Sequence, residues 1–439
     1  MSYAGRRVAV WGAARSGIAA ANLLTHFGAE VTLSDPRSET DLDLTGLASG
    51  VAVIFGTNAL AGAELLVPSP GIRPSIPVLV EARQRGVQIM SEIELAASVA
   101  KAPIVAITGT DGKSTTTAMV GAAVEGAGRR AIIAGNIGDP FSRRVLEAGS
   151  DDVLVIEVSA FQLWSCGHFC PQVAIITNIA EDHAEYFEHD TQAYIDAKAR
   201  VLHDMEAGST AVLRHDDAVV RGFAVPDGII TRWFEPTKRS QDWGFHQGQL
   251  TFDGRAVMAA NDLRVPGHHN ICNALSALAA GHGLGLDLPG MVAGLSEFTG
   301  LSHRLAHVRK RRGVHWYNDS KATNPHAASA GLLALERPLV VITGGYEKGL
   351  DLGPFVDALG QAKHVIVTGP TSGRTIEALA GRWPVTKATS MADAVTQAAE
   401  LSQRGDAVIL SPAASSFDAY RSYAHRGEVY ESEVLKLSD

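Results

Sequence analysis

The chain has 439 residues, of which 46% are hydrophobic, 19% are charged and 44 are glycine. This length suits two or three α/β domains, and the composition excludes disordered, collagen-like and coiled-coil chains. A formal net charge of −9 argues against general binding to nucleic acid or to an anionic membrane. Three cysteines form no disulfide framework, and no apolar run is long enough to cross a bilayer, so we expect a soluble cytoplasmic protein.

The chain begins with an apolar run, a glycine turn and a helix-forming stretch. The turn, Gly12–Gly17, is close to a dinucleotide-binding fingerprint, but Ala14 replaces the middle glycine. A plain βαβ turn explains these residues equally well. Arg15 also interrupts the apolar start, so we expect a first strand and not a targeting peptide. A nucleotide diphosphate could instead be gripped above the strand ends by Arg15, Ser16 and Arg37.

Apolar runs of strand length that end in Gly-rich or Ser-rich turns recur along the chain and alternate with helical stretches. This alternation indicates parallel sheets covered on both faces, with ligands bound where strands end and helices begin. From about residue 208 to 265 the runs are short, and Asp253-Gly254 signals a hairpin, so we predict an antiparallel insertion. The predicted fold class is α/β with three domains: a Rossmann-like domain at 1–95, a central P-loop-type ATPase domain with the insertion at 96–300, and a Rossmann-like domain at 301–439.

The strongest local motif is Gly109-Thr110-Asp111-Gly112-Lys113-Ser114-Thr115, which follows a buried strand and opens a helix. Its two glycines allow backbone N–H groups to approach an anion, and the helix start adds a partial positive charge. The lysine can neutralise the outer phosphates of a nucleotide, and Ser114 or Thr115 can ligate Mg²⁺. An isoleucine stands where the first glycine of the general pattern belongs, so a tight turn with a surface lysine is the alternative.

Three polar residues follow strand-like runs further along the chain: Glu157, Asp182 and His183. Open parallel sheets place chemistry at this end of their strands, and a phosphoryl-transfer site needs hard oxygen ligands for Mg²⁺. Each residue could singly cap a helix, and His183 could be an ordinary hydrogen-bonded histidine. Beside a phosphate loop, the set indicates a metal site.

Dense polar stretches at 303–304 and 318–324 lie outside amphipathic patterning. Asp319 and Lys321 could hold ribose and phosphate, and Arg304 could steady the transferred charge, although solvated loop charges are the alternative. The motif Cys166-Gly-His168-Phe-Cys170 has the spacing of a metal clip, but the chain holds no second pair. Buried thiols therefore explain it better.

Together these motifs resemble the Mur ligases, a family of ATP-dependent amide-forming enzymes of peptidoglycan precursor synthesis. The resemblance extends over essentially the whole chain. It rests on the phosphate loop, Glu181-Asp182-His183, Gly267-His268-His269-Asn270, His303-Arg304 and Asn318–Asn324. The block Leu410–Tyr420 is similar to that of the D-glutamate-adding members, and the Asp-Asn-Pro-Arg block of the diamino-acid-adding members is absent.

The resemblance implies that ATP phosphorylates the alanyl carboxylate of UDP-N-acetylmuramoyl-L-alanine, and that the amine of D-glutamate attacks the acyl phosphate. It implies ATP, two Mg²⁺ ions and a carbamylated Lys198 as the groups that the site uses. We expect a monomer with no nucleic-acid partner and no membrane insertion. Ala14, Pro36 and Ala160 depart from the family pattern near the precursor, and Tyr346-Glu347 departs from it before Lys348.

The resemblance also assigns roles to residues of this chain. The catalytic set is Lys113, Lys198, His183 and Lys348. Residues for ATP are Gly109, Thr110, Asp111, Gly112, Lys113, Ser114, Thr115, Asn270, Arg304, Asp319 and Lys321. Metal residues are Ser114, Glu157, His183 and Lys198. The UDP-sugar precursor would be held by Arg15, Ser16, Asp35, Arg37, Ser69, Gly71, Asn136 and Ser159. D-Glutamate would be held by Thr323, Lys348, Ser416 and Phe417, with Tyr423 nearby.

Three other functions compete with this interpretation. A ligase similar to folylpolyglutamate synthase would share the central and C-terminal blocks, but residues 1–95 argue against it. A nicotinamide-dependent oxidoreductase would use the first glycine turn and leave Gly112-Lys113-Ser114 unexplained. A nucleotide sensor without catalysis would not need the set formed by Glu157, His183 and Lys198.

Overall fold

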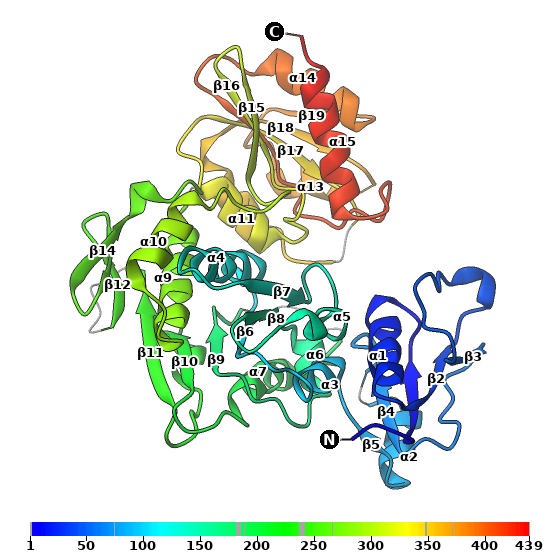
Figure 1. The fold of residues 1–439 in the computed structure, drawn as a ribbon. Coiled ribbons are helices and arrows are strands. Elements are labelled where there is room, and N and C mark those ends of the chain that lie inside the picture. The colour runs from blue at the N-terminus through cyan, green and yellow to red at the C-terminus, as the bar shows by residue number, and fades with distance from the viewer. Residues whose placement is uncertain are drawn as a thin grey trace. The chain divides into compact units, whose positions relative to one another are not determined.

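The computed structural model describes residues 2–73, 75–180, 186–188, 190–236, 242–265, 267–346, 349–370 and 372–438. The described chain forms three sheets, each accompanied by helices (Figure 1). It divides into two compact units, Met1–Leu263 with Ile271–Phe298, and Arg264–Asn270 with Thr299–Asp439. Within the described residues, no helix combines the length and the apolar character that crossing a membrane requires.

The first sheet is entirely parallel, with strand order β3-β2-β1-β4-β5. Its elements are β1 (Arg7–Trp11), α1 (Arg15–His26), β2 (Glu30–Asp35), β3 (Ala52–Phe55), β4 (Leu65–Pro68), α2 (Pro77–Gln84) and β5 (Gln88–Ile89). This strand order is that of a dinucleotide-binding half, which confirms the Rossmann-like prediction. The glycine turn lies between β1 and α1, at the carboxyl end of the central strand.

The second sheet has nine strands in the order β14-β13-β12-β11-β10-β9-β6-β8-β7. Its strands are β6 (Ile104–Thr108), β7 (Ala131–Gly135), β8 (Val153–Glu157), β9 (Val173–Ile176), β10 (Thr210–Arg214), β11 (Ile230–Glu235), β12 (Trp243–His246), β13 (Gln249–Phe252) and β14 (Arg255–Ala259). Its helices are α3 (Glu92–Ala97), α4 (Lys113–Gly126), α5 (Phe141–Arg144), α6 (Ala160–Trp164), α7 (Thr191–Ala199), α8 (Ala218–Arg221), α9 (His268–Gly283) and α10 (Leu288–Glu297).

The predicted antiparallel insertion is present, but it begins at β12 and not near residue 208. β10 pairs in parallel with β9 and with β11, and β11 pairs in parallel with β12. Only β12, β13 and β14 pair with one another as antiparallel strands. The segment between Arg214 and Ile230 is long enough for a crossover, and it contains α8, so it extends the parallel sheet.

The third sheet has the order β15-β16-β20-β17-β18-β19, and all its pairs are parallel except β15 with β16. Its strands are β15 (Ala306–Arg311), β16 (Val314–Asn318), β17 (Leu339–Gly344), β18 (Ala362–Thr368), β19 (Val385–Lys387) and β20 (Ala407–Leu410). Its helices are α11 (Pro325–Leu333), α12 (Gly353–Ala358), α13 (Ser372–Leu379), α14 (Met391–Leu401) and α15 (Tyr423–Lys436). Separate apolar clusters cover its two faces, one built around Phe355 and the other around Tyr430.

The inner strands of the central sheet are buried on both faces, which positions the loops at their carboxyl ends. Every residue of β6 and of β8 is buried, because helices pack on each side of the sheet. α4 follows β6 directly and packs against α10 in the same unit. The loops after β6, β8 and β9 therefore rise from a rigid base, which is where a functional site of such a sheet is expected.

Candidate functional site

The loop between β6 and α4 has the geometry of a phosphate cradle. Gly109 has φ +139°, and a Cβ there would lie 2.0 Å from Thr177 Oγ1. Gly112 has φ +80°, and a Cβ there would lie 2.6 Å from Asn273 Oδ1. Both positions therefore require glycine, and α4 begins immediately afterwards at Lys113. This confirms the strand, glycine loop and helix order that the sequence predicts.

The loop is braced by the end of the neighbouring strand β9. The Thr110 amide donates to the Asn178 carbonyl at 2.9 Å, and the Asp111 amide donates to Asn178 Oδ1 at 3.0 Å. The hydroxyl of Thr177 donates to the Asp111 carbonyl at 2.6 Å. These bonds fix the backbone of the loop without using the lysine. Sequence reasoning missed Thr177 and Asn178 as braces, although both follow an apolar run.

Two lysines converge on one backbone oxygen of this loop. Lys113 Nζ donates to the carbonyls of Gly109 at 3.0 Å and Thr110 at 2.6 Å. Lys198, on α7, also donates to the Gly109 carbonyl, although only 2% of its surface is exposed. The predicted pair of catalytic lysines is thus brought together at the mouth of the loop. Two ammonium groups beside a helix N-terminus can bind an anion.

Glu157 supplies a buried carboxylate at the end of β8. Its Oε1 accepts a hydrogen bond of 2.8 Å from Asn136 Nδ2, and Asn136 follows the adjacent strand β7. Its Oε2 is buried and has no hydrogen-bond partner among the described residues. Because a buried carboxylate oxygen needs a partner, and carboxylates are hard ligands, the site fits Mg²⁺.

The other predicted metal residues are placed in part. Ser114 is buried in the first turn of α4, and Lys198 lies beside Gly109. His183, with Glu181 and Asp182, lies outside the described residues. Among the residues that the structure describes, no group of three His, Cys, Asp or Glu side chains gathers to hold a metal. The ligand set therefore stays a prediction.

Ser159, predicted to contact the precursor, caps α6. Its hydroxyl donates to Gln162 Oε1 at 2.8 Å and accepts from the Gln162 amide at 3.3 Å, while its own amide donates to Gln162 Oε1. This is a capping box with glutamine as the second member. The side chain is 8% exposed, so the observed role of Ser159 is to start α6, the helix that follows β8.

In the first domain, Asp35 links the glycine turn to Arg37. Its carboxylate accepts from Arg37 Nε at 2.9 Å and Nη2 at 2.8 Å, and from the Ala13 amide at 2.8 Å. The Arg37 guanidinium, together with the backbone amides of Ala13 and Arg37, holds the pKa of Asp35 well below its usual range. The two predicted precursor residues therefore form one charged unit at the end of β2.

Ser69 contacts the same turn, and Arg15 and Ser16 begin the helix that follows it. Ser69 Oγ donates to the Gly12 carbonyl at 3.3 Å, and Arg15 Nη1 donates to the Gly138 carbonyl at 3.0 Å. A Cβ on Gly17 would lie 1.8 Å from the Gly12 carbonyl oxygen. Ser16 is half-buried at the start of α1, and Gly71 is exposed in the loop after β4. The missing middle glycine does not disturb the turn, because Ala14 is exposed at the helix N-cap.

In the second unit, Asp319 is a buried carboxyl group at the end of β16. Its Oδ1 accepts from the Leu305 amide at 3.0 Å, and Oδ2 has no hydrogen-bond partner among the described residues. Burial raises the pKa of Asp319 to about 7. Close by, Lys321 Nζ lies 3.8 Å from the centroid of the Tyr423 ring, so two residues with predicted ligand roles touch.

A buried arginine that sequence reasoning missed organises the same domain. Arg426, on α15, donates to Ser320 Oγ at 3.0 Å and to the Ser320 carbonyl at 2.8 Å. It also donates to the carbonyls of Ala414 and Ser415, each at 3.1 Å. Burial lowers its pKa to about 10. Arg426 thus ties the loop after β16 to the loop after β20, where the predicted Ser416 and Phe417 stand.

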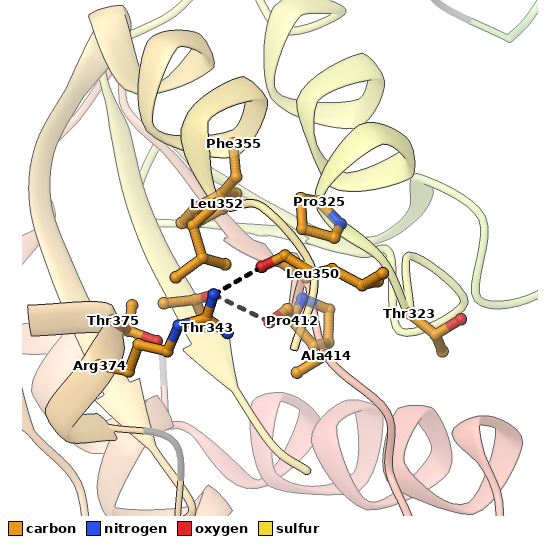
Figure 2. Close-up of a pocket in the computed structure, with 11 residues that line it drawn as sticks. Thr323, Pro325, Thr343, Leu350, Leu352, Phe355, Arg374, Thr375, Pro412 and Ala414 are labelled. Carbon is orange, nitrogen blue, oxygen red and sulfur yellow. Dashed lines mark hydrogen bonds between the residues drawn. The ribbon is translucent and has the colours of Figure 1, made fainter. Parts of the chain in front are cut away.

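A narrow pocket of about 20 Å³ opens between these loops and the α11, α12 and α13 side of the sheet (Figure 2). Its lining residues are Thr323, Pro325, Thr343, Leu350, Leu352, Phe355, Arg374, Thr375, Pro412, Ala413 and Ala414. Figure 2 shows Arg374 reaching the Leu350 carbonyl, at 2.9 Å, and Thr343 donating to the Pro412 carbonyl at 3.0 Å. Of the predicted D-glutamate residues, Thr323 lines this pocket, and Lys348 lies outside the described residues.

The predicted residues are divided between the two compact units. The phosphate loop and Lys198 belong to the first unit, and Asn270, Arg304, Asp319 and Lys321 belong to the second. Ser416 is buried, and Phe417 is 74% exposed. In the cysteine motif, the thiol of Cys166 is buried as predicted, whereas Cys170 is half-buried, and the Gly167 amide donates to Glu94 at 2.8 Å.

Fold and site together define an α/β protein with a glycine loop of phosphate-binding geometry. Models of known protein families match the chain in three consecutive segments. The Mur ligase MurD-like N-terminal domain matches residues 6–91, the Mur ligase middle domain matches residues 107–281, and the Mur ligase glutamate ligase domain matches residues 303–414. The chain belongs to the Mur ligase family.

Relatives match over nearly the full length. A UDP-N-acetylmuramoylalanine–D-glutamate ligase of Shouchella clausii is 39% identical, covering 99% of this chain and 98% of that protein. The protein of the same name from Salinibacter ruber is 38% identical, with 98% coverage of each. The solved structure of the UDP-N-acetylmuramate-alanine ligase MurC from Thermotoga maritima shares the fold at TM-score 0.64 and 20% identity, covering 98% of this chain and 100% of that chain.

Proposed function

We propose that this Mur ligase adds D-glutamate to UDP-N-acetylmuramoyl-L-alanine and converts ATP to ADP and phosphate. The convergence of Lys113 and Lys198 on the Gly109 carbonyl, at the mouth of a glycine loop, carries the proposal. The names of the full-length relatives support the choice of substrates. We assign the precursor to residues 1–95, ATP to 96–300 and the amino acid to 301–439.

The chemistry begins with an acid that is a poor electrophile. Transfer of the γ-phosphoryl group to the alanyl carboxylate turns one of its oxygens into a leaving group. The D-glutamate amine then attacks the carbonyl carbon, and phosphate leaves from the tetrahedral intermediate. Lys113 and the amides at the start of α4 hold the triphosphate and offset the repulsion between two anionic reactants.

We assign the metal site to Ser114, Glu157, His183 and Lys198. Oε2 of Glu157 supports this choice, because it is a buried hard ligand without a hydrogen-bond partner among the described residues. When bound, two Mg²⁺ ions would supply charge neutralisation to the phosphoryl oxygens. Carbamylation of Lys198 would convert its ammonium into an anionic oxygen ligand. The amino acid would bind near Thr323, Lys348, Ser416, Phe417 and Tyr423.

A substrate-omission assay tests the proposal. The purified protein should release phosphate only when ATP, Mg²⁺, UDP-N-acetylmuramoyl-L-alanine and D-glutamate are all present. Equal release with L-lysine or meso-diaminopimelate in place of D-glutamate would disprove the amino-acid assignment. Lys113→Ala should abolish turnover and keep the thermal unfolding temperature, whereas Lys436→Ala, which removes an exposed ion pair with Glu433, should change neither.

A further inference from the structure

Tyr194 contacts both the phosphate loop and Lys198, and it is buried, with 2% of its surface exposed. It belongs to α7, one turn before Lys198. Its hydroxyl lies 2.9 Å from Thr110 Oγ1, within the glycine loop. Its ring lies beneath Lys198 Nζ, 4.7 Å from the ring centroid. One side chain therefore contacts both the loop and the second lysine.

The hydroxyl of Thr110 links three parts of the site. Thr110 Oγ1 donates to the Ala180 carbonyl at 3.1 Å and accepts from the Ala180 amide at 2.9 Å. Either hydroxyl can donate in the 2.9 Å bond between Thr110 and Tyr194. Whichever donates, Thr110 joins the loop after β6 to the strand end after β9 and to α7.

The ring of Tyr194 has a separate effect on Lys198. An aromatic face attracts an ammonium group and also keeps water from one side of it. Lys198 in turn donates to the Gly109 carbonyl. The Tyr194 ring also packs against Phe187 in an edge-to-face contact, with centroids 5.4 Å apart, which restricts its rotation. Hydroxyl and ring thus act on two different parts of the same loop.

We propose that Tyr194 is a positioning residue, which sets the phosphate loop through Thr110 and the side chain of Lys198 through its ring. The inference rests on the proposed function, because it assigns to this loop the binding of a nucleotide. It predicts separable effects: loss of the hydroxyl loosens the loop that holds ATP, and loss of the ring also misplaces Lys198.

The variants are Tyr194→Phe, which removes the hydroxyl alone, and Tyr194→Leu, which removes the ring as well. The matched control is Tyr430→Phe, since the Tyr430 hydroxyl is buried and has no hydrogen-bond partner among the described residues. Tyr194→Phe should raise the KM for ATP about three- to tenfold, the value of one hydrogen bond. The KM values for the precursor and for D-glutamate should stay within twofold, and Tm should match that of the control.

Tyr194→Leu should lower kcat as well, by at least tenfold relative to Tyr194→Phe. Thr110→Val tests the same contact from its other side: in that background, Tyr194→Phe should have no further effect. An ATP KM for Tyr194→Phe equal to that of Tyr430→Phe would overturn the proposal. Equal rises in all three KM values with a lowered Tm, or additive effects in the double variant, would overturn it as well.

Titration with a fluorescent ATP analogue and Mg²⁺, without the other substrates, separates this inference from the proposed function. Wild-type protein that binds the analogue but does not join D-glutamate would refute the proposed function. The Kd values of the Tyr194 and Thr110 variants would still decide the positioning role. A three- to tenfold weaker Kd for Tyr194→Phe supports it, and an unchanged Kd refutes it.

Discussion

Asn136 holds one oxygen of Glu157 at 2.8 Å and leaves the other oxygen buried without a partner in the described chain. The two residues end neighbouring strands, β7 and β8, which pair in parallel through Gly135 and Glu157. The sequence assigned them to different ligands, the precursor and the metal. Their contact makes Asn136 a residue that orients the carboxylate of Glu157.

Glu157→Gln should abolish turnover and leave the fold intact or slightly more stable. The amide can still accept the bond from Asn136, but the substitution removes a buried charge whose second oxygen has no partner in the described part of the chain. Phosphate release should fall by at least about a hundredfold, on the scale of losing one preorganised electrostatic group, and differential scanning fluorimetry should show no loss of Tm. Glu64→Gln, at a half-exposed ion pair, is the control. Full activity of Glu157→Gln would contradict the assignment of Glu157 to the metal site.

Asp319 should make the second unit less stable as the pH rises. Its folded pKa is about 7, above the value near 3.8 in an unfolded chain, so only the folded state holds the proton between these values. Stability from this group is complete below about pH 4 and is lost progressively up to about pH 7. Asp319→Asn should therefore gain on the order of 2–4 kcal/mol relative to wild type at pH 8, but little at pH 4.

Chemical unfolding at pH 4 and at pH 8 checks this expectation for Asp319. Exposed Asp357→Asn should leave the difference between the two pH values unchanged. A wild-type protein whose second unit is equally stable at both values would contradict the raised pKa. If Asp319 also binds nucleotide, as the family resemblance implies, Asp319→Asn should lose ATP affinity while it gains stability.

Arg426→Met should destabilise the second unit by about 2–5 kcal/mol, because four hydrogen bonds from a buried guanidinium disappear. The carbonyls of Ala414 and Ser415 would be left without these donors, so the loop that carries Ser416 should loosen. We expect a KM for D-glutamate raised several-fold with an unchanged KM for ATP. Arg421→Met, at an exposed position before the same helix, should leave Tm unaltered. A stable Arg426→Met protein would show that the loops do not depend on this residue.

Asp35→Asn should weaken the first domain at neutral pH. The carboxylate has a strongly lowered pKa because of Arg37 and two amides, so its stabilisation is present above the unfolded value and is lost as the pH falls. At pH 7 the variant should unfold at a lower denaturant concentration than wild type, and its KM for the precursor should rise. The gap between the two proteins should narrow toward pH 2. A gap that widens in acid would contradict the assignment.

The sequence was sufficient for the features that local pattern determines. Apolar runs with glycine turns predicted the three sheets and the phosphate loop, because both depend on residues close together in the chain. The start of the antiparallel insertion was misplaced, since the crossover helix α8 spans only Ala218–Arg221, and so short a helix within polar sequence resembles a turn.

Long-range partners could not be predicted in the same way. Asn178 braces Asp111 across 67 positions, Asn273 meets Thr116 across 157, and Arg426 reaches Ser320 across 106. None of these residues differs locally from an ordinary polar residue of a loop or a helix. Their roles depend on which strands become neighbours, and that order is set by the packing of the whole sheet.

The shared oxygen of Gly109 has a further consequence for nucleotide binding. Two like charges tethered to one acceptor repel each other, so each lysine is held less firmly than it would be alone. A triphosphate would relieve that repulsion by accepting hydrogen bonds from one of the two lysines in place of the Gly109 carbonyl. Binding of the nucleotide and release of one lysine from the Gly109 carbonyl would then occur together. The repulsion that is relieved would add to the favourable free energy of nucleotide binding.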